Sequence, residues 1–196
     1  MIKLYSAQRC PYALRTRLAL QEKGLDYEHV EIDLRNKPAE FARISRYGKV
    51  PALFDGDRSL YESSIINEYL DEQYPEPPLM PEAPGDRAYA RIWIDFANTR
   101  LMPASARIAS AKTEDDKRAA RDTFGEHMAM VGGELGDGPW LLGTRYSLVE
   151  VTYAPFYARK ERYRGIDIPD NVLAWLQRIG ERPAYVRTGG LEPRKA

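Results

Sequence analysis

A proline-rich segment divides this chain into two parts of different character. Five prolines lie among the twelve residues of the stretch YPEPPLMPEAPG. Because proline cannot continue a helix and favours extended backbone, this stretch is predicted to be a linker. A chain of 196 residues is long enough for two small domains. We therefore predict a domain over residues 1–75, a linker over 76–86 and a second domain over 87–196.

Before the linker, the apolar residues alternate between strand and helix periods. The first strand is expected around Ile2 and Leu4, and the helix after it opens at Pro11 and ends before Gly24. The segment YEHVEIDL predicts a second strand, followed by a short helix at residues 38–44, strands in VPALFD and SLYE, and a helix at 63–74. This order predicts an α/β domain, with a mixed sheet and helices packed on it.

After the linker, the periodicity is helical throughout. Amphipathic helices are predicted at residues 87–101, 117–135, 148–159 and 172–179. Ser147 followed three residues later by Glu150 is a capping-box pattern, which we interpret as a folding element. The second domain is therefore predicted to be all-helical.

Composition excludes several classes of function. The 29 basic and 29 acidic side chains balance, which argues against direct nucleic-acid binding. No apolar run approaches the roughly 20 residues needed to cross a bilayer, and no secretory signal opens the chain, so a cytoplasmic protein without membrane partners is expected. The single cysteine excludes an internal disulfide, and the distant His29 and His127 give no metal site, so none is predicted.

That cysteine, Cys10, precedes Pro11 at the start of the first predicted helix. Proline suits the first helical position, which places Cys10 at the N-cap, where backbone N–H groups and the helix dipole stabilise a thiolate. Thiols at such sites titrate well below the free value of about 8.5, and the adjacent Arg9 adds positive charge. The alternative is a small buried residue, which is where lone cysteines usually lie. The context favours a reactive thiol.

Two further motifs suggest a peptide-like ligand. In GKVPAL, a cis peptide bond before Pro51 would leave the backbone of Val50 able to pair with an extended ligand, although an ordinary edge-strand proline explains the pattern equally well. In YESSII, Ser63 is predicted to cap the following helix and bind a carboxylate, with Glu62 binding an amino group. The alternative is a plain helix cap.

The order of these motifs resembles that of the glutathione transferase superfamily over nearly the whole chain. CPYALRTRLAL and LRNKPAEF resemble the cysteine-type, omega-like transferases. YESSIINEYLDEQYPEPPLMP and YSLVEVTYAPF resemble the bacterial stringent starvation protein A group. The resemblance implies a thioredoxin-like N-terminal domain that binds glutathione, an all-α C-terminal domain that shapes the second-substrate pocket, and a homodimer.

The resemblance also implies roles for individual residues. Cys10 is the catalytic thiol that forms a mixed disulfide with glutathione. The implied glutathione-binding residues are Tyr12, Lys37, Val50, Pro51, Glu62 and Ser63, with Lys37 at the glycyl carboxylate and Glu62 and Ser63 at the γ-glutamyl head. Trp93 and Phe96 are candidates for the second-substrate pocket, with core packing as the alternative.

The implied function is glutathione-dependent thiol transfer or reduction, with substrates such as glutathione mixed disulfides and dehydroascorbate. Because the chain has no second cysteine, glutathione must resolve the mixed disulfide. One alternative is conventional conjugation to electrophiles, for which Tyr5 or Ser6 is the candidate hydroxyl. The other is a regulator that binds RNA polymerase, like stringent starvation protein A. That group commonly has Pro-His-Pro where this chain has Glu76 between two prolines, and generally lacks a cysteine at position 10.

Overall fold

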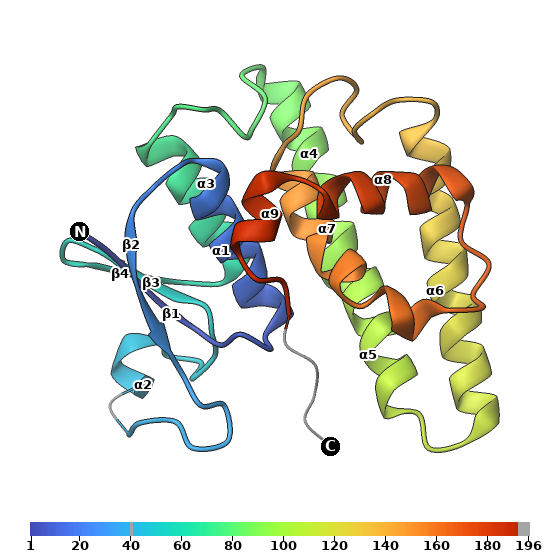
Figure 1. The fold of residues 1–196 in the computed structure, drawn as a ribbon, viewed down its shortest axis with the longest axis horizontal. Helices are drawn as coiled ribbons and strands as arrows, with labels where there is room; N and C mark the ends of the chain where they lie inside the picture. Colours follow the sequence, from blue (N-terminus) through green and yellow to red (C-terminus); the bar gives the residue numbers. More distant parts are fainter. Residues whose placement is uncertain (40, 192–196) are drawn as a thin grey trace. The chain divides into compact units, whose positions relative to one another are not determined.

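The computed structural model of the protein describes residues 1–39 and 41–191 (Figure 1). These residues form two compact units. The first contains Met1–Leu79 together with the chain from Arg182 onward, and the second is Met80–Glu181. This division differs from the predicted boundaries because the end of the chain returns to the first unit. Arg182 helps to hold this last segment against the first unit, because its guanidinium donates to both carboxylate oxygens of Glu22, at 2.6 and 2.7 Å.

The first unit contains a four-stranded sheet with the strand order β2-β1-β3-β4. Its strands are β1 (Ile2–Ser6), β2 (Tyr27–Glu31), β3 (Ala52–Asp55) and β4 (Arg58–Tyr61). β2 is parallel to β1, whereas β3 is antiparallel to both β1 and β4. The mixed sheet predicted from the apolar pattern is therefore confirmed.

Helices cover both faces of this sheet. α1 (Pro11–Glu22) and α3 (Ser63–Gln73) lie beside each other on one face (Figure 1), over a buried apolar cluster. That cluster consists of Ile2, Leu4, Leu20, Leu53, Ile66 and Leu70. Side chains alternate along a strand, so Tyr5 points to the other face, where its ring lies 6.2 Å from that of Phe41 on α2 (Phe41–Ile44). α9 (Pro183–Arg187) packs along α1.

The second unit is helical, as predicted. Its elements are α4 (Pro84–Phe96), the π-helical turn η1 (Ala97–Leu101), α5 (Met102–Ser110), α6 (Glu114–Leu135), α7 (Leu148–Ala158), the 3-10 helix η2 (Lys160–Tyr163) and α8 (Asp170–Gly180). The predicted helix end at Leu101 is wrong. Pro103 lies in the first turn of α5, where a proline breaks no helical hydrogen bond, and η1 continues the chain into that helix.

Two features organise the core of the second unit. The rings of Tyr153 and Trp175, both fully buried, lie 5.0 Å apart and join α7 to α8. At the start of α7, Ser147 and Glu150 form the predicted capping box. No helix among residues 1–39 and 41–191 has the length and apolar character that a membrane span requires.

Candidate functional site

Cys10 lies between β1 and α1, at the N-cap of the helix, as predicted. Its backbone is extended, with φ −84° and ψ 119°, and Pro11 is the first helical residue. The amide of Cys10 donates to the carbonyl of Ala7 at 2.9 Å, and its carbonyl accepts from the amide of Leu14 at 3.0 Å. These bonds hold the residue at the positive end of the helix dipole.

The side chain of Cys10 is nearly buried, with 8% of the residue exposed. It belongs to an apolar cluster with Ala7, Ala13, Ile32, Phe41 and Val50. Its Sγ donates to the backbone carbonyl of Val50, 3.6 Å away. Apolar surroundings disfavour a thiolate, whereas a helix N-terminus favours one. Cys10 is therefore buried, as the alternative interpretation expects of a lone cysteine, and it also lies at a helix N-terminus, as a reactive thiol would.

The Val50–Pro51 peptide bond is cis and immediately precedes β3. Because the carbonyl of Val50 accepts from Cys10, the motif GKVPAL is in direct contact with the thiol. Lys37 extends to the same segment, where its Nζ donates to the carbonyl of Gly48 at 2.8 Å. Tyr12 is exposed on the first turn of α1, with the guanidinium carbon of Arg15 5.1 Å from its ring centre.

The prediction that Ser63 caps α3 is wrong. Glu62 is the N-cap residue and Ser63 is the first residue of the helix. Glu62 has a φ of 73°, and its carbonyl accepts from the amide of Ile66 at 2.9 Å, so the helical bonding starts one residue earlier than predicted. The side chain of Glu62 is exposed, whereas Ser63 is buried.

The strand register brings these segments to one end of the sheet. Tyr5 of β1 is paired with Ala52 of β3, which is paired in turn with Tyr61 of β4. Cys10 follows the end of β1, the cis peptide bond precedes β3, and Glu62 follows β4. The thiol, the backbone of Val50 and the start of α3 therefore emerge from three adjacent strands at the same edge.

Trp93 and Phe96 lie on α4, in the second unit. Trp93 is buried, and its ring is 5.4 Å from that of Phe96. Phe96 also contacts the ring of His127, at 5.5 Å, and Tyr153 donates to the backbone carbonyl of Trp93 at 3.2 Å. Burial lowers the pKa of His127, and Arg100 lowers it further. This packing matches the core alternative for Trp93 and leaves the pocket assignment a prediction.

Sequence reasoning missed Arg17. This residue is 2% exposed, and its guanidinium donates to Ser6 Oγ at 2.9 Å. It is located on the α1 face shared by Ala13 and Leu20, and a charged residue at such a position is a signal in itself, since charges are rarely buried unless paired. The buried hydroxyl of Ser6 is thus already bound to a guanidinium.

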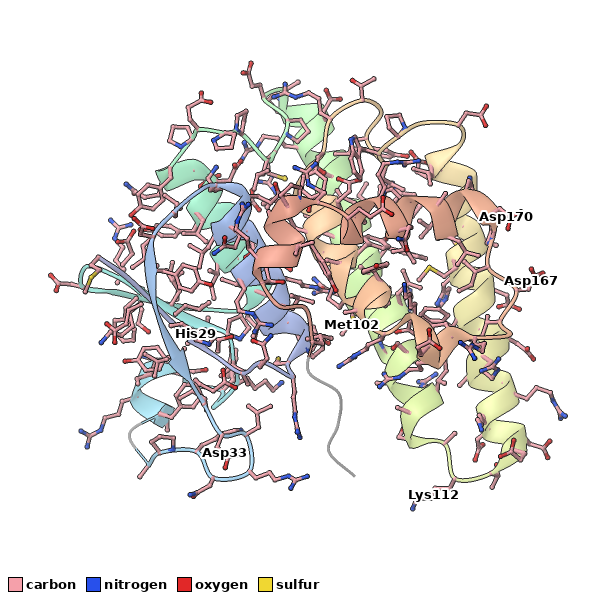
Figure 2. The ribbon with its side chains drawn as sticks, in the orientation of Figure 1. His29, Asp33, Met102, Lys112, Asp167 and Asp170 are labelled. Carbon is pink, nitrogen blue, oxygen red and sulfur yellow. The ribbon has the colours of Figure 1, made fainter. Side chains whose placement is uncertain are left out.

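Among the described residues, no group of three or more His, Cys, Asp and Glu side chains is arranged to hold a metal ion. His29 on β2, labelled in Figure 2, instead contacts Glu31, with Nε2 3.1 Å from Oε2. Asp170, also labelled there, is an acidic residue in the first turn of α8, where negative charge complements the helix dipole.

Comparisons with known proteins place this chain. The family model for the N-terminal domain of glutathione S-transferase matches residues 4–78, and that for the C-terminal domain matches residues 87–178. Glutathione S-transferase U19 of Arabidopsis thaliana is 30% identical over 185 residues, which cover 90% of this chain and 84% of the relative. The chain belongs to the glutathione S-transferase family. The predicted thioredoxin-like and helical architecture is thereby confirmed.

Other known proteins are similar to this chain over nearly their full lengths. The Stringent starvation protein A homolog of Haemophilus influenzae is 29% identical, with coverage of 97% of this chain and 91% of the relative. The crystal structure of glutathione transferase Omega 3C from Trametes versicolor has a TM-score of 0.90 and 27% identity, covering 98% of this chain and 90% of that chain. Rice GST1, solved in complex with glutathione, has a TM-score of 0.87 and 30% identity, covering 97% and 90%.

Proposed function

We propose that this transferase is a glutathione-dependent thiol transferase in which Cys10 is the catalytic nucleophile. The observation that carries the proposal is the position of Cys10, at the N-terminus of α1 and in contact with the carbonyl of Val50. Among cysteine, serine and tyrosine side chains, a cysteine at a helix N-terminus is the one best suited to become an anion at neutral pH.

Glutathione is an extended tripeptide with two carboxylates and one ammonium group, and the sheet edge offers complementary groups. Lys37 would bind the glycyl carboxylate and Glu62 the ammonium group. Ser63 at the start of α3 would bind the γ-glutamyl carboxylate, because backbone N–H groups converge there. The backbone of Val50 beside the cis Pro51 would pair with the cysteinyl unit, and Tyr12 would line the site.

The reaction proceeds through two thiol–disulfide exchanges. The Cys10 thiolate attacks the glutathionyl sulfur of a mixed disulfide, so a Cys10–glutathione disulfide forms and the substrate leaves as a thiolate that takes a proton from solvent. The thiolate of a second glutathione then attacks the glutathionyl sulfur of that disulfide. Oxidised glutathione leaves, and the Cys10 thiolate is regenerated. In total, the mixed disulfide is reduced to the substrate thiol and one free glutathione is oxidised, because the other half of the oxidised glutathione comes from the substrate.

Conventional conjugation is less well supported by the contacts around β1. It needs a hydroxyl that can donate to the thiolate of glutathione. Ser6 is fully buried and its Oγ lies 2.9 Å from Arg17 Nη1. The ring of Tyr5 packs against Phe41 and Phe54, with ring centres 6.2 and 5.8 Å away. Both candidate hydroxyls thus belong to residues used in packing.

The decisive experiment compares the wild-type protein with Cys10→Ser and Cys10→Ala. Wild-type protein should reduce a glutathione mixed disulfide and form a glutathione adduct that intact mass spectrometry detects. Both variants should lose the adduct and at least about 100-fold of the turnover, because a hydroxyl is a poor nucleophile without an activating base. Undiminished thiol transfer by either variant would refute the proposed role of Cys10.

A regulator that binds RNA polymerase is the second candidate, and the match to the stringent starvation protein A homolog supports it. Calorimetric titration with glutathione separates the two functions. Saturable binding, weakened by Lys37→Ala, supports the enzyme, whereas no heat change at millimolar glutathione supports the regulator. We also propose that the chain forms a homodimer, which sedimentation velocity tests directly.

A further inference from the structure

Arg17 joins the segment that precedes Cys10 to the end of the chain. Its Nη1 donates to Ser6 Oγ at 2.9 Å and to the carbonyl of Ala7 at 3.2 Å. Its Nη2 donates to the carbonyls of Gln8, at 3.4 Å, and Gly190, at 2.9 Å. One guanidinium therefore binds the last residue of β1, the two residues that follow it and Gly190, all within the first unit.

Gln8 makes a second connection between the same two segments. Its Nε2 donates to the carbonyls of Thr188, at 3.3 Å, and Gly190, at 3.1 Å. The carbonyl of Gly190 thus accepts from both Gln8 and Arg17. Gly189 and Gly190 have φ angles of 69° and 62°, a conformation that glycine adopts without steric cost. Residues 188–190 therefore form a C-terminal clasp on the segment that leads to Cys10.

The guanidinium of Arg17 lies close to Cys10, because Arg17 Nη1 and the amide of Cys10 donate to the same acceptor, the carbonyl of Ala7, at 3.2 and 2.9 Å. Burial lowers the pKa of the Arg17 guanidinium, and nearby groups that are negative when ionised raise it; these are Tyr27, Glu31, Cys10 and Tyr185. Because electrostatic interaction is reciprocal, the guanidinium in turn favours a thiolate at Cys10. Glu31 on β2 acts the opposite way, and its Oε1 accepts from the amide of Gln8 at 2.8 Å. Arg9 is only partly buried, and the buried Arg15 lies over the ring of Tyr12, whereas Arg17 is bonded to residues 6–8.

From these contacts we infer that Arg17 is a positioning residue, held by the C-terminal clasp, that keeps Cys10 a reactive thiolate at neutral pH. The apolar cluster around Cys10 disfavours the anion, and a fixed positive charge nearby adds to the stabilisation that the helix N-terminus supplies. The inference rests on the proposed function, because a reactive thiolate matters only where Cys10 is the nucleophile. It assigns the regulation of that thiol to a segment 178 to 180 residues away in sequence.

The test uses the 196-residue chain without glutathione, and follows thiolate absorbance near 240 nm and iodoacetamide alkylation as functions of pH. Since Cys10 is the single cysteine, alkylation reports on it alone, and subtracting the titration of Cys10→Ala removes the absorbance of the 13 tyrosines. Arg17→Met should move the titration midpoint upward by about one pH unit and slow alkylation at pH 7 about tenfold. Arg17→Lys, which keeps the charge but not the planar fork, should shift it less. Gln8→Leu should give a smaller upward shift through the clasp.

Arg187→Gln is the matched control. Arg187 bonds to Gln21 of α1, with Nε 2.9 Å from Oε1, so this variant removes a cation and a contact outside the clasp while the hydrogen bonds of Gln8 and Arg17 to residues 188–190 stay in place. It should leave the midpoint unchanged. An unshifted midpoint in folded Arg17→Met, or an equal shift in Arg187→Gln, would overturn the inference. Where circular dichroism shows Arg17→Met unfolded, unshifted midpoints in both Arg17→Lys and Gln8→Leu overturn it.

The two proposals fail separately. A wild-type thiolate at neutral pH that depends on Arg17, in a protein with no thiol transfer, would contradict the proposed function and leave the role of Arg17 standing. Thiol transfer that needs Cys10 but is unaffected by Arg17→Met and Gln8→Leu would support the proposed function and contradict the role of Arg17.

Discussion

Glu62 has a left-handed φ of 73° immediately before Ser63, the first residue of α3. Within residues 1–39 and 41–191 it is the only residue other than glycine with a positive φ. Such a conformation costs a side-chain-bearing residue about 1–3 kcal/mol and is typical of functional sites. A glutamate in a position where glycine is more stable agrees with the proposed contact between its carboxylate and the γ-glutamyl ammonium group.

Glu62→Gly should therefore make the protein more stable and less able to bind glutathione. Relief of the backbone strain, less the entropy that glycine loses on folding, gives an expected gain of about 1 kcal/mol in the free energy of unfolding. Loss of one charge-assisted contact should weaken glutathione binding about tenfold or more. Urea denaturation and calorimetric titration measure the two effects.

Glu62→Gln is the matched control for this change. It keeps the strained backbone and removes the charge, so stability should stay near the wild-type value while glutathione affinity falls. Wild-type glutathione affinity in both variants would exclude Glu62 from the site. A Glu62→Gly protein less stable than wild type would show that the conformation is not strained.

The parts of the site that follow from local rules could be predicted from the sequence. Pro11 after Cys10 specifies a helix start, because proline fits the first helical turn and disfavours helical backbone in the residue before it. Ser147 and Glu150 satisfy each other's backbone donors within four residues, so their capping box needs no information from elsewhere in the chain.

The parts that depend on distant contacts could not be predicted. The return of Arg182 to Glu22 joins residues 160 apart in sequence, and no periodicity encodes such a pairing. Arg17 was overlooked because its partners are mainly backbone carbonyls, which every sequence offers. The error at Ser63 arose because serine is a strong N-cap former, whereas tertiary structure placed Glu62 there instead.

Glu150 should give the protein a distinctive pH dependence. Its carboxyl is fully buried and accepts from the amides of Leu141 and Ser147, both at 2.9 Å, and from Ser147 Oγ at 2.8 Å. Burial raises its pKa above the ordinary value of 4.5, and these hydrogen bonds oppose the rise. A carboxyl whose pKa is higher folded than unfolded stabilises the protein below the unfolded pKa and loses that contribution as pH rises through the folded pKa.

Glu150→Gln should therefore lower the free energy of unfolding most at low pH. An amide offers one acceptor oxygen where the carboxyl offers two, so a loss of about 1–3 kcal/mol is expected near pH 4.5. The difference between the unfolding free energies of this variant and of the wild type, measured by urea denaturation, should decrease as pH rises toward 8. Ser105→Ala is the control, since its hydrogen bond to Tyr163, at 2.6 Å, joins two groups that stay neutral in this range. A deficit in Glu150→Gln that widens with pH would contradict the raised pKa.

Gly180, at the end of α8, allows this helix to pack closely against α7. A Cβ at this position would overlap the ring of Tyr157. Gly180→Ala should therefore lower the free energy of unfolding by about 1–3 kcal/mol, as overpacking typically does.

Gly133→Ala is the control for this change. Gly133 lies in α6 with nothing within 4 Å of an added Cβ, so this variant should instead raise the free energy of unfolding by about 0.5–1 kcal/mol. If the contact with Tyr157 is the cause, Tyr157→Leu combined with Gly180→Ala should restore part of the loss. Wild-type stability of Gly180→Ala alone would show that α7 and α8 do not pack this closely.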